Sequence, residues 1–196
     1  VLQFINWYPQ LVPYHPGRGW ALWAPTDVGP PLLAEVADYQ LQVRAPEGIV
    51  VASGGPVERR GNVWQFQMRN ARSIAFSSSP HYELKTRTEA GVTLYLFYLR
   101  EHTFAADAVL TAATRALVLF NDQFGHYPYR SLVIAQDAYL SSVAAGGLLL
   151  HSGQGFKNYT GQPDTLLLAL LPLTMAHLWW GQVVGYHPIA EPWLGA

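Results

Sequence analysis

Polar and apolar residues alternate along several segments of the first hundred residues. In residues 39–46 a leucine and a valine fall on one face, and glutamine and arginine fall on the other; this pattern is typical of a half-buried strand. Residues 63–69 alternate in the same way, and the glycine-rich residues 54–62 between them predict a hairpin-type connection. The alternation continues through residues 73–79, 81–87 and 92–99. We therefore predict a twisted antiparallel sheet or sandwich over residues 1–99.

The spacing of apolar residues changes near residue 100. Thr103 is suited to cap a helix that continues to about residue 124, and Gly125 is suited to end it. One face of this helix would carry an apolar stripe made of Val109, Ala113, Ala116, Leu117 and Phe120. Recurrence at three- and four-residue intervals predicts that this stripe faces a core.

Short strands and a loop follow this helix. Residues 131–136 and 147–152 are apolar enough to predict two short strands, and residues 153–164 read as a loop. Most strands precede the helices along the chain, so the predicted fold class is α+β. It consists of an antiparallel β-domain over residues 1–99 and an α/β lobe over residues 100–196.

A long uncharged stretch lies near the C-terminus. Residues 165–190 contain no Asp, Glu, Lys or Arg, and the stretch is long enough to span a bilayer. It also contains Pro172, His177 and two glycines, and no cluster of basic residues flanks it. We therefore favour a buried helix, or two helices meeting at Pro172, over a membrane-spanning helix.

Composition excludes several classes of function. The chain has 196 residues, of which 50% are hydrophobic and 13% charged, so it has ample apolar surface to bury and is not disordered. A formal net charge of −1 argues against nucleic acid as a partner. Cysteine is absent, which excludes disulfides, thiolate zinc sites and cysteine nucleophiles.

One motif near the C-terminus points to a family. Residues 174–184 read TMAHLWWGQVV. His177 followed by Trp179-Trp180-Gly181 resembles the second half of H-E-x-x-H-x-W-W-G, the zinc helix of aminopeptidase N-like metallopeptidases, the gluzincin aminopeptidases. WLGA at residues 193–196 resembles their W-L-x-E segment and follows His177 at the family's distance.

The resemblance extends over nearly the whole chain. FGHYPYRSLVIA at 124–135 is similar to the family's G-x-Y-P-Y segment, and AAGGLLLHS at 144–152 to the edge strand of its thermolysin-like domain. Segments similar to the later strands of the N-terminal β-domain, especially in bacterial members, are residues 6–14, 35–54 and 72–83. The resemblance implies that residues 1–99 are the C-terminal part of such a β-domain. Residues 100–196 would be the first half of a thermolysin-like catalytic lobe, as in the middle of a larger enzyme.

The residues that the family's chemistry requires are replaced. The family binds Zn²⁺ with two histidines one helical turn apart and a Glu from the next helix, and a further Glu activates the zinc-bound water. The matching positions hold Leu173, His177 and Ala196 for the ligands and Thr174 for the base, so only His177 is able to ligate. Ala144 stands where the family has a Glu that holds the substrate's amino group. The resemblance thus implies a pseudoenzyme with no intact catalytic or zinc site, and we expect no cofactor.

The leading interpretation is a non-catalytic, aminopeptidase-like structural or binding module. We expect it to pack against another protein subunit or the remainder of a longer chain, with Trp179, Trp180 and Trp193 at packed or interface positions. One alternative is a zinc aminopeptidase that hydrolyses N-terminal residues of peptides through a metal-activated water. Another is an accessory subunit of a membrane complex. The resemblance weakly favours an extracytoplasmic or membrane-associated location.

A relocated metal site is a further alternative. The second half of the chain contains the candidate ligands His151, Asp164, His177, His187 and Glu191. No pair of them has the four-residue spacing of two ligands on one helix face. We therefore favour the interpretation that His177 is a buried histidine satisfied by hydrogen bonds.

Overall fold

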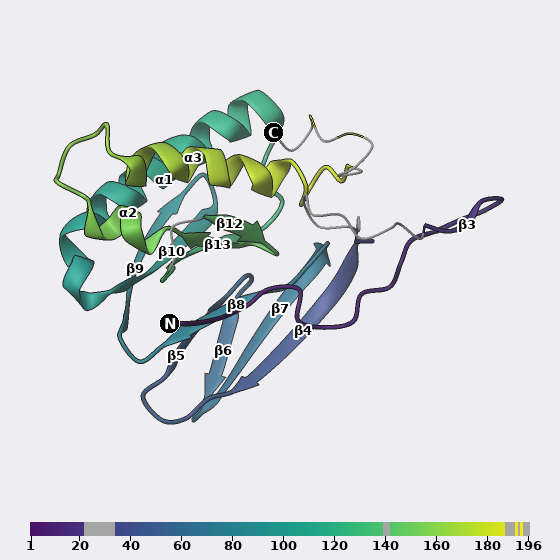
Figure 1. The fold of residues 1–196 in the computed structure, drawn as a ribbon, viewed down its shortest axis with the longest axis horizontal. Coiled ribbons are helices and arrows are strands. Elements are labelled where there is room, and N and C mark those ends of the chain that lie inside the picture. The colour runs from purple at the N-terminus through teal and green to yellow at the C-terminus, as the bar shows by residue number, and fades with distance from the viewer. Residues whose placement is uncertain (22–33, 139–141, 187–190, 192, 194–196) are drawn as a thin grey trace.

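Helices and β-sheets are stacked in layers in the computed structural model, which describes residues 1–21, 34–138, 142–186, 191 and 193 (Figure 1). The helices lie on one face of a five-stranded sheet, and smaller sheets lie beneath its other face. The predicted α+β class is confirmed. Most strand pairs are antiparallel, and two pairs inside the five-stranded sheet are parallel.

The first strands form three small sheets. One sheet has the order β1-β8-β5, a second the order β4-β7-β6, and the third is a β2–β3 hairpin that projects away from the rest (Figure 1). The strands are β1 (Leu2–Phe4), β2 (Tyr14–His15), β3 (Gly19–Trp20), β4 (Ala37–Arg44), β5 (Val50–Ser53), β6 (Val57–Arg60), β7 (Val63–Ala71) and β8 (Phe76–Ser79). The expected apolar face of residues 63–69 is confirmed, because Trp64, Phe66 and Met68 are buried.

The five-stranded sheet has the order β12-β13-β11-β10-β9. Its strands are β9 (Tyr82–Glu89), β10 (Val92–Leu99), β11 (Ser131–Gln136), β12 (Val143–Ala145) and β13 (Leu148–His151). The three central strands are parallel, and the two edge strands are antiparallel to their neighbours. This sheet takes strands from both sides of residue 99, the boundary expected between the β-domain and the lobe.

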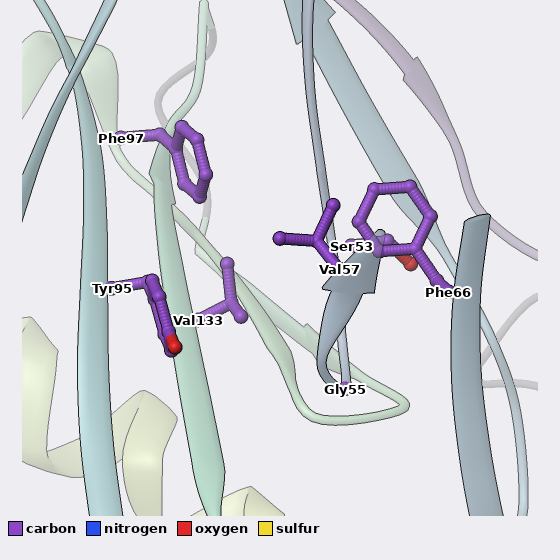
Figure 2. A pocket seen from close by; sticks show the side chains of 7 residues that line it. All are labelled: Ser53, Gly55, Val57, Phe66, Tyr95, Phe97 and Val133. Atoms are coloured by element: carbon purple, nitrogen blue, oxygen red, sulfur yellow. The ribbon is translucent and has the colours of Figure 1, made fainter. Parts of the chain in front are cut away.

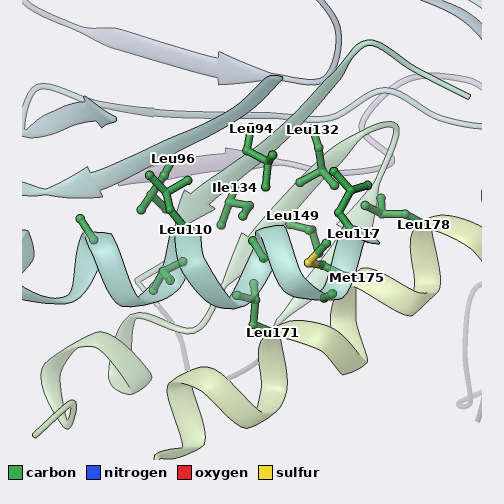
Figure 3. Packing of buried hydrophobic residues seen from close by; sticks show 14 of the residues in the cluster. Leu94, Leu96, Leu110, Leu117, Leu132, Ile134, Leu149, Leu171, Met175 and Leu178 are labelled. Atoms are coloured by element: carbon green, nitrogen blue, oxygen red, sulfur yellow. The ribbon is translucent and has the colours of Figure 1, made fainter. Parts of the chain in front are cut away.

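Four helical elements accompany this sheet. They are the 3-10 turn η1 (Arg100–His102), α1 (Thr103–Phe124), α2 (Gly153–Lys157) and α3 (Leu166–Trp179). The main core lies between the helices and the sheet, where Leu110 and Leu117 of α1 and Leu171 of α3 meet strand residues such as Leu94 and Ile134 (Figure 3). The two long helices also pack against each other.

The opposite face of the five-stranded sheet packs on the smaller sheets. Strand β11 is apolar from Leu132 to Ala135 because both of its faces are covered. Leu132 and Ile134 face the helices, whereas Val133 and Ala135 face the smaller sheets. Backbones approach closely at this junction. A Cβ on Gly54 would lie 1.7 Å from the carbonyl oxygen of Gly146, so only glycine fits there.

Some predicted elements differ from the observed ones. The segment 54–62 contains the four-residue strand β6, and the predicted loop 153–164 contains α2, which Ser152 caps by accepting a hydrogen bond from the Gly155 amide. Pro172 lies inside a single helix and does not divide it. That helix ends at Trp179, several residues before Gly185.

Two helices bear on the membrane alternative. In the described part of the chain, Arg100–Phe124 is long and apolar enough to cross a membrane by length and composition. Its residues Val109, Leu110 and Leu117 are buried in the main core, which is the position of a core helix. Helix α3 has fourteen residues, or about 21 Å at 1.5 Å per residue, which is shorter than the roughly 30 Å of a bilayer's hydrocarbon core.

Candidate functional site

Helix α3 carries three of the positions that the resemblance assigns to the zinc site. Leu173 and His177 lie one turn apart on the same side of one continuous helix. Leu173 is 56% exposed and His177 is half-buried, so this side of the helix is open to solvent. The expectation that His177 is a buried histidine is therefore wrong, because the residue is only half-buried.

Thr174, at the position of the family's general base, is turned toward the protein. The residue is buried, and its hydroxyl donates a 2.8 Å hydrogen bond to the carbonyl oxygen of Leu170, one turn earlier. Threonine side chains commonly bond their own helix in this way. The hydroxyl proton is therefore engaged by the backbone, which leaves the group poorly placed to activate a water.

Ala144 lies on β12, the edge strand of the sheet, opposite Leu149 of β13. Strand β12 contacts α3, and Ala144 packs against the same core as the inner face of that helix. The structure therefore brings the strand of Ala144 beside the helix of His177. Ala196, the remaining predicted position, lies outside the described residues.

The other candidate metal ligands do not assemble. Among the described residues, no group of three His, Asp or Glu side chains is close enough to hold a metal ion. Asp164 and Glu191 are exposed. His151 is fully buried, and hydrogen bonds occupy both of its ring nitrogens. His187 lies outside the described residues.

The tryptophans of the motif have different environments. Trp179 is buried, its indole Nε1 donates a 2.9 Å hydrogen bond to the carbonyl oxygen of Gly125, and its ring contacts Phe120 and Tyr127 with centroids 5.3 Å away. Trp180 is half-buried and meets Phe124 edge to face. Trp193 is 71% exposed. Trp179 thus packs in the core and joins the ends of α1 and α3.

An apolar stripe follows the solvent side of α3. Leu166 and Leu173 are exposed. The two consecutive valines that follow the helix, Val183 and Val184, are exposed as well. Ala169 lies between the two leucines on the same side. The prediction of a buried helix is therefore right for the inner face and wrong for the outer one. We call the set Leu166, Ala169 and Leu173 the α3 stripe.

A buried polar cluster lies where β11 and β13 end, and sequence reasoning missed it. His151 Nε2 is 2.8 Å from the carbonyl oxygen of Leu167, and His151 Nδ1 is 3.1 Å from Ser142 Oγ. Desolvation by burial lowers the pKa of His151 to about 4, and the bond to Leu167 opposes the shift. Serines lie near His151 in the sequence, but no periodic pattern indicates that Ser142 and the Leu167 carbonyl group would both reach its ring.

A small recess lies on the other side of the five-stranded sheet. It is open on one side, and Tyr95, Phe97 and Val133 of the sheet face Val57 and Phe66 across it (Figure 2). The nearby Ser53 hydroxyl donates to the carbonyl oxygen of Ala75 at 2.7 Å. The lining is therefore mostly apolar, and its polar side-chain groups are the hydroxyls of Ser53 and Tyr95.

No protein-family model matches the chain, and no curated protein matches its sequence. Membership of the gluzincin aminopeptidases thus stays a prediction from the short motifs that include Trp179-Trp180-Gly181. The geometry adds two facts to those motifs. The helix of His177 lies beside the strand of Ala144, and Leu173, at one of the ligand positions, is exposed.

Proposed function

We propose that the chain is a non-catalytic, aminopeptidase-like module whose C-terminal half corresponds to part of a thermolysin-like lobe. Its function would be to bind another protein subunit through the α3 stripe. The observation that carries this proposal is the exposed Leu173 one turn before His177. A hydrocarbon side chain cannot ligate zinc, but it favours burial against a partner.

The neighbours of Leu173 support the same proposal. Thr174 bonds its own helix, and Ala144 presents only a methyl group from β12. These residue types fit packing and do not fit metal-activated hydrolysis. We therefore propose that the motif residues that match the family, including Trp179, hold α3 in place.

The chemistry of the partner follows from the lack of charge. Residues 165–190 contain no Asp, Glu, Lys or Arg. A helix that lies on a membrane surface usually carries Lys and Arg beside its apolar face, and α3 has neither. An apolar protein surface is the better match, because it leaves no charge unpaired when it covers Leu166 and Leu173.

A dye-binding comparison tests whether the α3 stripe is an accessible apolar surface. We expect the isolated chain to enhance the fluorescence of anilinonaphthalene sulfonate and Leu173→Glu to reduce it, because a carboxylate interrupts the stripe. Leu84→Glu is the matched control. Leu84 is 50% exposed, but β9 carries no other large apolar side chain that is exposed. Both variants should keep the free energy of unfolding within about 0.5 kcal/mol of the wild type.

Light scattering on the same samples completes the test. Self-association of the wild type that Leu173→Glu reduces would support an adhesive α3 stripe. A wild type that binds no dye and stays monomeric at high concentration would contradict the proposal. Equal loss of dye binding in Leu84→Glu and Leu173→Glu would contradict the assignment to α3.

A further inference from the structure

His151 connects three segments at the end of the five-stranded sheet. It is the last residue of β13 and is fully buried. Its Nε2 lies 2.8 Å from the carbonyl oxygen of Leu167 in the first turn of α3, and its Nδ1 lies 3.1 Å from Ser142 Oγ just before β12. Ser142 Oγ also accepts a 3.1 Å hydrogen bond from the amide of Ser152, the cap of α2.

These partners define the protonation state of the imidazole. The Leu167 carbonyl oxygen can only accept, so Nε2 carries a proton and donates it. In the neutral ring Nδ1 then has a lone pair, which accepts from the hydroxyl of Ser142. Neutral His151 therefore satisfies Leu167 and Ser142 at once.

We infer that His151 is an acid-sensitive latch, which holds the first turn of α3 and Ser142 while it is neutral and releases them when it is protonated. A proton on Nδ1 would turn this atom from an acceptor into a donor. The Ser142 hydroxyl would lose the group to which it donates, and a positive charge would be enclosed in the core. Both effects favour an open state in which the ring reaches water.

The surroundings contain little that would compensate an imidazolium. Just after β11, the Asp137 amide donates to the His151 carbonyl oxygen, and the pKa of His151 is lowered by burial. On α2, the ring of Phe156 lies 5.9 Å away and Lys157 at the helix end is exposed. Helix α3 has only His177 as a titratable group.

One further histidine lies beyond Phe156. His102 of η1 is buried, and its ring is 6.1 Å from that of Phe156. Its Nδ1 is 2.8 Å from Gln136 Nε2 and accepts a hydrogen bond from it. An imidazole carries no negative charge, so His102 cannot compensate a positive charge on His151. Tyr82, whose hydroxyl donates to the Gln136 carbonyl oxygen, has its pKa raised, chiefly by burial, and stays neutral through this pH range.

The direction of the pH effect follows from the two states. Above about pH 6.5 both the latched and the open states hold a neutral His151. Between pH 6.5 and about pH 4 the open state takes up a proton and the latched state does not, so falling pH favours opening. The difference between these two pKa values corresponds to a shift of about 300-fold in the opening equilibrium. Since α3 carries the stripe, opening would also disrupt the proposed docking surface, a consequence that rests on the proposed function.

Hydrogen–deuterium exchange on the isolated chain tests the latch without any partner. We expect opening of Leu166–Trp179, corrected for intrinsic exchange rates, to rise by about 100-fold between pH 7 and pH 4, because at pH 4 the latched state is itself half-protonated. The rise should exceed that of β10. His151→Gln keeps a neutral donor and acceptor, and it should remove this extra pH dependence. His177→Gln, on the same helix, should retain the wild-type profile.

A second variant keeps the test valid if His151→Gln does not fold. Ser142→Ala retains the imidazole but removes the donor to Nδ1, so α3 should open more at pH 7 than in the wild type. Its extra pH dependence should become smaller, because the pKa of His151 in the latched state rises toward that in the open state. The inference would be overturned by equal pH dependence in α3 and β10, which would indicate global unfolding. Retention of the extra pH dependence in His151→Gln would overturn it as well. Neither result would bear on dye binding by the α3 stripe at pH 7.

Discussion

Replacing Trp179 with alanine is expected to destabilise the protein by about 3–5 kcal/mol, the usual cost of removing a buried aromatic side chain. Its indole ring is enclosed by Phe120 and Tyr127, and its Nε1 donates to the carbonyl oxygen of Gly125 just after α1. The substitution would leave a cavity between the ends of α1 and α3. It would also leave that carbonyl oxygen without its indole donor.

The neighbouring tryptophan provides the matched control. Trp180 is half-buried, and its ring contacts that of Phe124 edge to face, so Trp180→Ala should cost about 1 kcal/mol. Urea denaturation followed by circular dichroism gives both free energies of unfolding. Equal costs for the two variants would contradict the assignment of Trp179 as the residue that holds α3 on α1.

Restoring two ligand positions is expected to create a zinc site. In the double variant Leu173→His/Ala196→Glu, the histidines at 173 and 177 would lie one turn apart on the open side of α3. Each added ligand should contribute more than the 10–100-fold typical of an outer-shell partner, so the affinity for Zn²⁺ should rise by more than about 10³-fold. Isothermal titration calorimetry measures this difference.

The design of this variant depends on the environment of Thr174. That residue is buried, so Thr174→Glu would enclose a carboxylate and is left out of the binding test. The control adds His177→Ala to the double variant and should abolish the gain in zinc affinity. If the folded double variant binds zinc no better than the wild type, the alignment of Leu173 and Ala196 with the family's ligands is wrong.

The sequence correctly predicted those elements in which the spacing of apolar residues directly indicates the buried face. The stripe of α1 is an example, because Val109, Ala113 and Leu117 recur on one helix face and are all buried. Strand β11 was predicted with its observed bounds because it is apolar on both faces. Helix α2 was missed because its stability depends on the Ser152 cap and on packing of Phe156, and its two glycines disfavour a helix.

The candidate site was predictable in part. The shared face of Leu173 and His177 follows from helical spacing alone. The exposure of Leu173 does not follow, because a uniformly apolar helix gives no sign of which side meets the core. The contacts of His151 with Ser142 and Leu167 depend on how β13, α2 and α3 converge, and no local pattern encodes that convergence.

The most direct test of the pseudoenzyme proposal is the zinc content of the wild-type chain, purified without chelator or histidine tag and measured by mass spectrometry. Our account predicts no more zinc than in a His177→Ala variant, because a single imidazole does not hold Zn²⁺ without further ligands. Near-stoichiometric zinc in the wild type that His177→Ala removes would contradict it, and would favour a zinc aminopeptidase that completes its site with other groups.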